Sequence, residues 1–541
     1  MKAQLQLFLL NLSKCDEQTT IPRTHTKRFA STNLSSTILW VFVWCILASG
    51  QIHAQTDVSG TIVNQTWTAN NSPYIVVGNI NVAGLVISPG VWVQFASNYS
   101  FEVDGLLQAL GTPSAPIIFT GTNVGWQGIF FNFSSPGSVL ACCIISNSLN
   151  SGIRISNTSV AINNCLIANN TNPGNGGGGI LASTTTDNVT LQNCTVINNT
   201  SGYSGGGIYA ITGTNTLTMT GCVFSNNIAN FSQNYGSYYG GGIYVSGNFL
   251  LENCVVRDNT CRGESTDYEP QYAVGGGLYI STGSTTIENC IFAGNTAVCG
   301  TLNERDSVWP AYGGGIYIQD GSLAMTNSIL SSNVTSSSYG EYGAGLGVSS
   351  SATNSSVVNC TFAYNNTQGI YSLGTEPQVM NSILFFNNDN GAQISGATNA
   401  TYCDVQGGFV GLGNINLNPV FQSTTNLIIV EGSPCIDAGN TNAQYNDVCF
   451  PPSLGTQLND MGAHGGPRAG ALFQIEAWPQ IEVLLFGGVP GYTYLIQGST
   501  NLMDWQTVEQ FQIANVGDVI NYFESTTNTL PQRFYRLNLA K

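Results

Sequence analysis

The sequence predicts an all-β fold: a solenoid of about 11–13 coils of parallel strands, a parallel β-helix, followed by a small C-terminal β domain. Three observations lead to this prediction. One motif recurs nine times with fixed internal spacing, the segments around it alternate apolar and polar residues, and the repeat varies in length at one corner only. A coil of about 22 residues cannot bury its own apolar side, so only a stack of coils forms a continuous core.

Each repeat is built around an anchor Cys or Ser that usually follows an Asn. An apolar residue comes two positions after the anchor, and an Asn comes five positions after it in every repeat. In coils stacked roughly 4.8 Å apart, such an Asn hydrogen-bonds to its neighbours above and below. The anchors are Cys142, Cys165, Cys194, Cys222, Cys254, Cys290, Ser328, Cys360 and Ser382. The Asn residues that follow them are Asn147, Asn170, Asn199, Asn227, Asn259, Asn295, Asn333, Asn365 and Asn387.

A Gly-Ile or Gly-Leu pair opens a strand ahead of each anchor. The anchor follows that Ile or Leu by 11–14 residues, whereas the next Ile or Leu follows the anchor by 10–26 residues. The variable loops therefore all lie at one corner, just before these strands, where a site is expected. The Gly-Gly-Gly runs in the loops repeat in register and are followed by no Lys-Ser/Thr pair, so they are interpreted as structural bends and not as phosphate loops.

The cysteines fall into two groups. The anchor cysteines alternate in register with Ile and Phe, and we expect them to point inward as reduced thiols. Cys261 and Cys299 lie in the loops of adjacent coils and are a candidate disulfide, and Cys435 and Cys449 are a second candidate pair. Disulfides suit an oxidising compartment, but sequence spacing alone leaves their connectivity open.

Residues 1–54 are predicted to be a Sec-type export leader. Lys27 and Arg28 precede an apolar run, Thr37 to Ala48, which is too short to span a bilayer, and Ala54 stands at the expected cleavage point. We therefore expect a secreted or cell-surface, outer-membrane-associated protein with no membrane span after cleavage. The processed chain would carry eight Lys and Arg against 27 Asp and Glu, a net charge of −19. Such a charge argues against nucleic acid or an anionic membrane as a partner.

The rest of the chain divides into four parts. Residues 55–125 lack the motif but alternate as strands, and they are expected to form N-terminal capping coils. Residues 126–410 carry the repeats, residues 411–470 are expected to form a C-terminal cap, and residues 471–541 a small β-sandwich-like domain. We expect the protein to be a monomer.

These motifs carry a resemblance to known families. The repeats resemble those of the right-handed parallel β-helix proteins of the pectate-lyase-like superfamily. The pairing of Gly-Gly-x-Ile with Phe-x-x-Asn, as at Phe224 and Asn227, is similar to polymorphic outer membrane protein repeats, and residues 433–439 resemble the choice-of-anchor Q domain. The resemblance implies a right-handed helix in an exported bacterial protein, and it implies little about activity. The Asn-Thr-Asp, Gly-His-Gly and Arg-Ile-Lys motifs of polygalacturonases do not occur in the sequence.

One outward position beside the inward Ile or Leu is a tyrosine in four successive coils. Such a strip is either a ladder that stabilises the sheet or a platform for sugar rings. The adjoining loops add further aromatic residues, including Tyr268 and Trp309. We favour a non-catalytic protein whose loop-walled face contacts a polysaccharide or cell-surface glycan, without a cofactor or metal. The strip consists of Tyr209, Tyr244, Tyr279 and Tyr317.

Two other functions stay open. A divergent polysaccharide lyase or glycoside hydrolase would take its charged groups from the loops. Arg257, Arg262 or Arg305 would then supply the cation or base, and Asp258, Asp267 or Asp306 would hold calcium or act as an acid. A structural spacer that displays the C-terminal domain would need no site. His464, the single histidine after the leader, is expected to have no metal or triad role.

Overall fold

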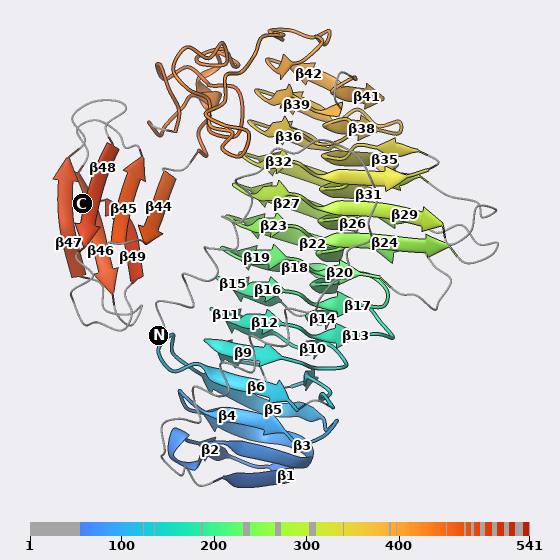
Figure 1. The fold of residues 1–541 in the computed structure, drawn as a ribbon, viewed down its shortest axis with the longest axis vertical. Helices are drawn as coiled ribbons and strands as arrows, with labels where there is room; N and C mark the ends of the chain where they lie inside the picture. Colours follow the sequence, from blue (N-terminus) through green and yellow to red (C-terminus); the bar gives the residue numbers. More distant parts are fainter. Residues whose placement is uncertain are drawn as a thin grey trace, which may run out of the picture.

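The computed structural model describes residues 55–469, apart from gaps at 123, 135, 185–187, 231–237, 266–271, 302–309, 339, 389–390, 397 and 451, and beyond residue 469 it describes six strands. Within these residues a 33-stranded sheet winds into stacked coils (Figure 1). All neighbouring coils pair in parallel, and each coil has three faces. The fold is therefore a parallel β-helix, as the sequence predicts.

The first face lies after the Gly-Gly bends. Its strands pair coil by coil in the order β1, β3, β5, β7, β10, β14, β18, β22, β26, β31, β35, β38 and β41, so thirteen coils are described. The strands confined to this face are β7 (Ile129–Asn132), β10 (Ile153–Ser156), β14 (Ile180–Ser183), β26 (Leu278–Thr282), β35 (Leu346–Ala352), β38 (Ile370–Ser372) and β41 (Ile394–Gly396). Strands that continue around a corner onto another face are β1 (Thr56–Ile62), β3 (Tyr74–Ile87), β5 (Phe101–Leu110), β18 (Ile208–Thr220), β22 (Ile243–Glu252) and β31 (Ile316–Thr326).

The second and third faces complete each coil. The second face adds β2 (Gln65–Trp67), β8 (Ser138–Ala141), β11 (Val160–Asn163), β15 (Val189–Gln192), β27 (Ser284–Glu288), β36 (Ser356–Val358), β39 (Gln378–Met380) and β42 (Asn399–Thr401). The third face, after the anchors, adds β4 (Trp92–Phe95), β6 (Ile117–Gly121), β9 (Cys143–Ser146), β12 (Leu166–Ala168), β16 (Thr195–Ile197), β19 (Val223–Ser225), β23 (Val255–Arg257), β28 (Ile291–Ala293), β32 (Ile329–Ser331), β37 (Thr361–Ala363), β40 (Ile383–Phe385) and β43 (Asp404–Val405). Two short 3-10 helices, η1 (Ala69–Asn71) and η3 (Ala443–Tyr445), lie outside the coils.

One hydrophobic core fills the interior from Ile62 to Val405. The inward positions alternate along each strand, as the period-2 pattern predicts. In the first coils the core is aromatic, and the Phe95 ring stacks on Trp126 with 4.2 Å between centroids. Farther along the stack, the same inward positions are occupied by Ile, Val, Phe and Cys.

The anchor cysteines are buried thiols, as predicted. The amide of Cys194 donates to Sγ of Cys222 in the next coil at 3.4 Å, and Sγ of Cys222 donates to a carbonyl in turn. Serine serves at the same position, since the amide of Cys290 donates to Oγ of Ser328 at 3.1 Å. Burial raises the pKa of Cys360 to about 12, so this thiol stays protonated and unreactive.

The first repeat departs from the predicted register by one residue. Cys143, not Cys142, stacks with Cys165, because the amide of Cys143 donates to Sγ of Cys165 at 3.4 Å. Cys142 instead occupies the turn with a φ of 50°, and Asn147 lies at a second turn with a φ of 61°. Ser148 takes the ladder position that was predicted for Asn147. Two adjacent cysteines satisfy the motif equally well, and only pairing with the next coil selects one of them.

The Asn ladder is confirmed from the second repeat onward. Asn227 is representative: its Oδ1 accepts the backbone amide and the side-chain Nδ2 of Asn199, each at 3.0 Å. Its own Nδ2 donates to the carbonyl of Val196 and to Oδ1 of Asn259. At the far end, Oε1 of Gln393 closes the ladder on Asn387. Each buried amide is thus fully hydrogen-bonded, which explains why Asn recurs at this position.

The long loops are themselves stacked strands. One added sheet consists of β13 (Thr171–Asn172), β17 (Thr200–Ser201), β20 (Ile228–Ala229), β24 (Thr260–Ser265), β29 (Thr296–Thr301) and β33 (Val334–Ser337). A second consists of β21 (Tyr238–Tyr239), β25 (Ala273–Val274), β30 (Ala311–Tyr312) and β34 (Glu341–Tyr342). Figure 1 shows β24 and β29 extending to one side of the stack. A small core lies between the two sheets, formed by Tyr238, Cys261, Ala273, Ala297, Cys299 and Ala311.

Neither candidate disulfide is present in the structure. Cys261 pairs in register with Ala297, and Cys299 pairs with Gly263, so the two cysteines are diagonal neighbours. Diagonal positions are about 7–8 Å apart, beyond the reach of an unstrained disulfide. Cys435 is a thiol whose Sγ lies 3.2 Å from Oδ2 of Asp404, and Cys449 is also a thiol. Both pairings were therefore wrong.

The segment after the last coil covers the side of the stack as well as its end. At the end, Asp404 bridges to Ile415, and Phe409 packs on the main core. Residues 459–468 then run back across several coils along the corner between the second and third faces. Nδ2 of Asn327 donates to the carbonyl of Ala463, and Arg468 forms an ion pair with Glu288. The sequence predicted a cap over the open end and did not predict this lateral clasp.

The last part of the chain forms two antiparallel three-stranded sheets. The first contains β44 (Leu472–Ala477), β45 (Ile481–Phe486) and β48 (Val519–Glu524). The second contains β46 (Thr493–Ser499), β47 (Gln506–Gln512) and β49 (Phe534–Leu539). These strands form the small C-terminal β domain that the sequence predicts. No helix in the described part of the chain is long and apolar enough to cross a bilayer.

Candidate functional site

The predicted tyrosines form a continuous stack on the outer side of the first face. Each aligns with the next in the strand register. The rings are nearly parallel: Tyr209 and Tyr244 lie 4.4 Å apart at 7°, and Tyr244 and Tyr279 lie 5.4 Å apart at 16°. Tyr279 and Tyr317 follow at 5.9 Å. The outward direction predicted from period-2 alternation is therefore confirmed, since none of the four belongs to the inner core.

The added strands cover the upper half of this stack. Tyr239 packs on Tyr279 with centroids 4.5 Å apart, and Tyr312 packs on Tyr317 at 5.9 Å. As a result Tyr279 is 5% exposed and Tyr317 is 6% exposed. Burial raises the pKa of Tyr279 above its ordinary range. These two rings are buried and cannot act as a platform for a ligand, so this part of the predicted binding set is wrong. They instead pack the added strands against the first face.

The cluster extends beyond the four predicted rings. At Gly347 the ladder lacks a side chain, and the Tyr317 ring occupies the space where a Cβ would lie. The stack resumes at Tyr371, which packs against Tyr342 at 4.7 Å. The sequence did not reveal this continuation, because Tyr371 belongs to a coil without a long loop and Tyr342 lies on an added strand.

The lower half of the stack stays open. Tyr209 and Tyr244 are half-buried, and burial raises the pKa of Tyr209 to about 12 with a smaller contribution from its tyrosine neighbours. Tyr203, on the turn after β17, is 46% exposed and lies close enough to add to that shift. One side of the Tyr209 ring packs on Gly176, where a Cβ would lie 2.4 Å from Cδ2. An aromatic surface with one free edge therefore remains.

Below Tyr209 the same outward row changes character. In successive coils it carries Leu181, Arg154, Phe130 and Glu102. The Arg154 guanidinium lies over the Phe130 ring, 4.4 Å from its centroid. Sequence analysis missed this group, because the four residues share no motif and meet only through coil-to-coil register. The open tyrosines therefore adjoin one cation, Arg154, and two apolar side chains, Leu181 and Phe130.

The residues assigned to the enzymatic alternative do not converge in the described part of the chain. Arg257 pairs with its neighbour Asp258 at 3.7 Å, with both side chains about half exposed. Arg262 is exposed on β24. Among the described residues, no group of three or more His, Cys, Asp and Glu side chains is placed to hold a metal ion. The remaining predicted residues, Arg305, Asp267, Asp306, Tyr268 and Trp309, lie outside the described residues.

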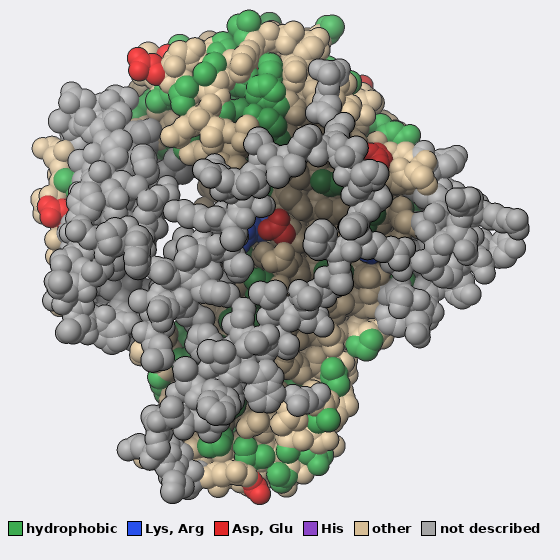
Figure 2. Space-filling view, viewed as in Figure 1, with side chains coloured by type: hydrophobic (Ala, Val, Ile, Leu, Met, Phe, Trp, Pro, Cys, Tyr) green, Lys and Arg blue, Asp and Glu red, His purple; other side chains and the backbone are tan. Residues whose placement is uncertain are grey.

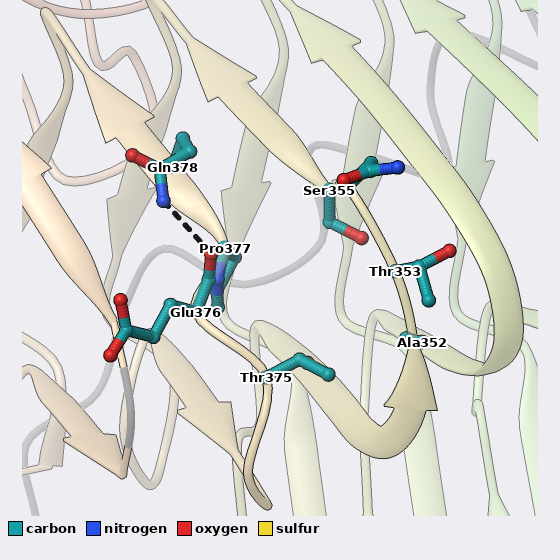
Figure 3. Close-up of a pocket in the computed structure, with 8 residues that line it drawn as sticks. Ala352, Thr353, Ser355, Thr375, Glu376, Pro377 and Gln378 are labelled. Atoms are coloured by element: carbon teal, nitrogen blue, oxygen red, sulfur yellow. Dashed lines mark hydrogen bonds between the residues drawn. The ribbon is translucent and has the colours of Figure 1, made fainter.

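On the face seen in Figure 2, few charged side chains are visible among the described residues. A hollow of about 310 Å³ opens at the corner between the first and second faces, where β35 and β36 meet the following coil (Figure 3). Its one carboxylate is Glu376, whose carbonyl accepts a hydrogen bond from Nε2 of Gln378. This hollow therefore lacks the carboxylate pair that glycoside hydrolysis requires. It is lined by Ala352, Thr353, Asn354, Ser355, Thr375, Glu376, Pro377 and Gln378.

Buried carboxyl groups organise the clasp. Oδ2 of Asp460 accepts the amide of Leu454 at 2.6 Å, and Asp447 accepts the amide of Asp460 at 3.1 Å. Burial raises the pKa of Asp460 to about 7 and that of Asp447 to about 6, with nearby carboxylates adding to both shifts. These groups hold the clasp through backbone amides. His464 lies in the same segment, and burial lowers its pKa to about 4.

The raised pKa values predict a pH-dependent clasp. In the unfolded chain these carboxyls release their protons near pH 4, whereas in the folded chain they keep them until pH 6–7. Their contribution to stability is therefore greatest below about pH 4 and is lost as the pH rises through 6–7. His464 acts in the opposite direction, because its lowered pKa reduces stability as the pH falls below 6.5, but the two carboxyls outweigh it. We therefore expect a higher melting temperature at pH 5 than at pH 8 by calorimetry. Asp460→Asn should shrink this difference, and an unchanged difference in that variant would contradict the assignment.

A comparison with protein-family models agrees with the architecture. A family model described as "Right handed beta helix region" matches residues 117–224 and 276–406. Among solved structures, the chain is similar to the crystal structure of pectate lyase Pel9A, with 14% identity, 75% of this chain and 96% of that chain covered, and a TM-score of 0.33. No curated protein matches the chain. The family match and the parallel pairing of the coils define the class: an all-β right-handed parallel β-helix with a small C-terminal β domain.

Proposed function

We propose that this is an exported, non-catalytic β-helix protein whose first face contacts glycans through the open end of its tyrosine stack. The observation that carries the proposal is the pair formed by Tyr209 and Tyr244, which are parallel, half-buried and held in register by two strands. Because the two rings stack face to face, a sugar would meet their ring edges and hydroxyl groups, which offer apolar contact and hydrogen-bond partners at low entropic cost.

The geometry around this pair supports a contact surface. The added strands rise beside the upper rings and form a wall, because Tyr239 packs onto Tyr279 at the height where the open stack ends. Below, Leu181 and the Phe130–Arg154 pair continue the same row. A linear glycan lying along the row would meet apolar surface over several coils. The proposed site is thus narrower than the loop-walled face predicted from the sequence, and it lies lower on the stack.

Export is part of the proposal. It rests on the basic flank, short apolar run and small residue that end at Ala54. The high Asn and Gly content of the turns and the acidic balance of the chain suit a surface exposed to water outside the cell. Edman sequencing of the protein recovered from a bacterial expression host should begin near Gln55. Recovery of the uncleaved chain from the cytoplasm would contradict export.

Two tyrosine substitutions separate binding from stability. Tyr244→Thr should weaken binding of any glycan found on an array at least tenfold and cost about 1 kcal/mol of stability, because Thr keeps β propensity. Tyr279→Thr should leave the open rings in place but cost about 3 kcal/mol, because its ring is buried between two sheets. Isothermal titration and thermal melts measure the two effects.

The opposite pattern would overturn the proposal. If Tyr244→Thr retains full glycan binding, the stack only stabilises the sheet. Catalysis is checked on the same samples by sizing the glycan after prolonged incubation with the wild-type protein. Shortened chains would show that the non-catalytic part of the proposal is wrong.

A further inference from the structure

Arg154 is a cation that forms no ion pair with a carboxylate in the described part of the chain. Its guanidinium rests on the Phe130 ring, and its Nε is buried with no hydrogen-bond partner among the described atoms. Leu181, the next residue in the row, is apolar. A guanidinium has five donors in a fixed fork, and leaving them unpaired at a half-buried site costs free energy.

Among the described residues, the carboxylate whose charge acts on Arg154 is Glu102, and it is already engaged. Glu102 lies two coils from Arg154, with Phe130 between them in the row. It accepts a hydrogen bond from Nδ2 of Asn132 at 3.0 Å. Burial lowers the pKa of Arg154, and the charge of Glu102 only partly offsets this. The site is therefore a partly buried positive charge that forms no ion pair with the described carboxylates.

We propose that Arg154 binds the anionic group of a glycan in which acidic sugars are isolated between neutral ones. This rests on the proposed glycan contact at Tyr209 and Tyr244 and names its ligand class. Arg154 lies two coils below Tyr209, a span of roughly 9.6 Å, which is on the scale of a disaccharide. One acidic group on Arg154 thus places a neutral sugar ring over Leu181 and Tyr209.

The charge distribution disfavours a polymer that carries an acid on every sugar. Its next acidic groups would fall beside Leu181 on one side and toward Glu102 on the other. Neither position offers a cation, and Glu102 repels an anion. The chain outside the leader also carries a net charge of −19, which opposes the approach of any polyanion. Because Arg154 is the one cation in this row of described residues, the row favours a ligand with one isolated negative charge.

Matched glycans test the inference on the full-length protein. The probes are the hyaluronan trisaccharide with a single carboxylate between two neutral sugars, the same trisaccharide after carboxyl reduction, and oligogalacturonates with a carboxylate on every sugar. We expect the first to bind at least tenfold more tightly than the other two. Arg154→Gln should remove that advantage, and Arg154→Lys should retain part of it, because Lys keeps the charge but lacks the fork. Thermal melts confirm that both variants fold.

Each other outcome decides against the inference. If carboxyl reduction or Arg154→Gln leaves affinity unchanged while Tyr244→Thr abolishes it, the glycan surface stands and the anion site is wrong. If oligogalacturonates bind best, the isolated-charge argument fails. If none of the three probes and no glycan on an array binds, the inference and the proposed function both fail.

Discussion

Replacing Asn259 with alanine should lower the free energy of unfolding by about 4 kcal/mol. Oδ1 of Asn259 accepts two hydrogen bonds from Asn227, and its Nδ2 donates to the carbonyl of Phe224 and to Asn295. Alanine would leave the backbone amide of Asn227 and one of its two Nδ2–H groups without acceptors inside a buried ladder. Each unsatisfied buried group costs about 1–3 kcal/mol, and the lost side chain also opens a cavity. Guanidinium unfolding followed by far-UV circular dichroism measures the change.

The neighbouring Asn226 provides the matched control. It is exposed and adopts a φ of 52°, a conformation that glycine accepts without strain. Asn226→Gly should therefore change stability by less than about 1 kcal/mol. Equal losses in the two variants would show that any substitution in this turn is damaging and that the ladder has no special role.

Gly276→Ala should prevent the protein from folding or lower its free energy of unfolding by more than about 3 kcal/mol. Gly276 is the middle glycine of a Gly-Gly-Gly bend. A Cβ there would lie 2.4 Å from the carbonyl oxygen of Gly314 and 2.5 Å from the carbonyl carbon of Thr296. Both obstacles are backbone atoms of neighbouring strands, so no side-chain rotation relieves the clash. Soluble yield and the thermal midpoint measure the effect.

Gly174 offers the control for this substitution. It is exposed in a short loop, and a Cβ there would meet nothing within 4 Å. Gly174→Ala should be neutral or should stabilise the protein slightly, because alanine restricts the unfolded chain. A normal melting temperature in Gly276→Ala would show that the bends have room for a side chain and that their glycines are present for another reason.

The open and covered parts of the tyrosine stack show what the loops contribute. Tyr209 and Tyr279 occupy the same place in the repeat, and their sequence contexts are nearly the same. Their exposures differ because Tyr239 reaches Tyr279 from an added strand, whereas Gly176 faces Tyr209. Function on this fold is therefore set by short insertions that cover or uncover a repeated surface.

The sequence by itself determined the solenoid, the inward anchors and the Asn ladder. These depend on spacings of two and five residues that recur in each coil, so local periodicity specifies which side chains face the core. It also located the outward tyrosines and the corner that carries the insertions. The stacked thiols follow from the same alternation, since Cys222 and Phe224 lie two residues apart on one strand.

Only the tertiary structure decided which of these side chains remain accessible and what lies beside them. The choice between Cys142 and Cys143, the burial of Tyr317 and the meeting of Arg154 with Phe130 all depend on how one coil aligns with the next. The lateral clasp brings Arg468 to Glu288 across 180 residues of chain. Such contacts join segments whose separation varies with loop length, so no local pattern encodes them, and the free energy of the packed stack selects them.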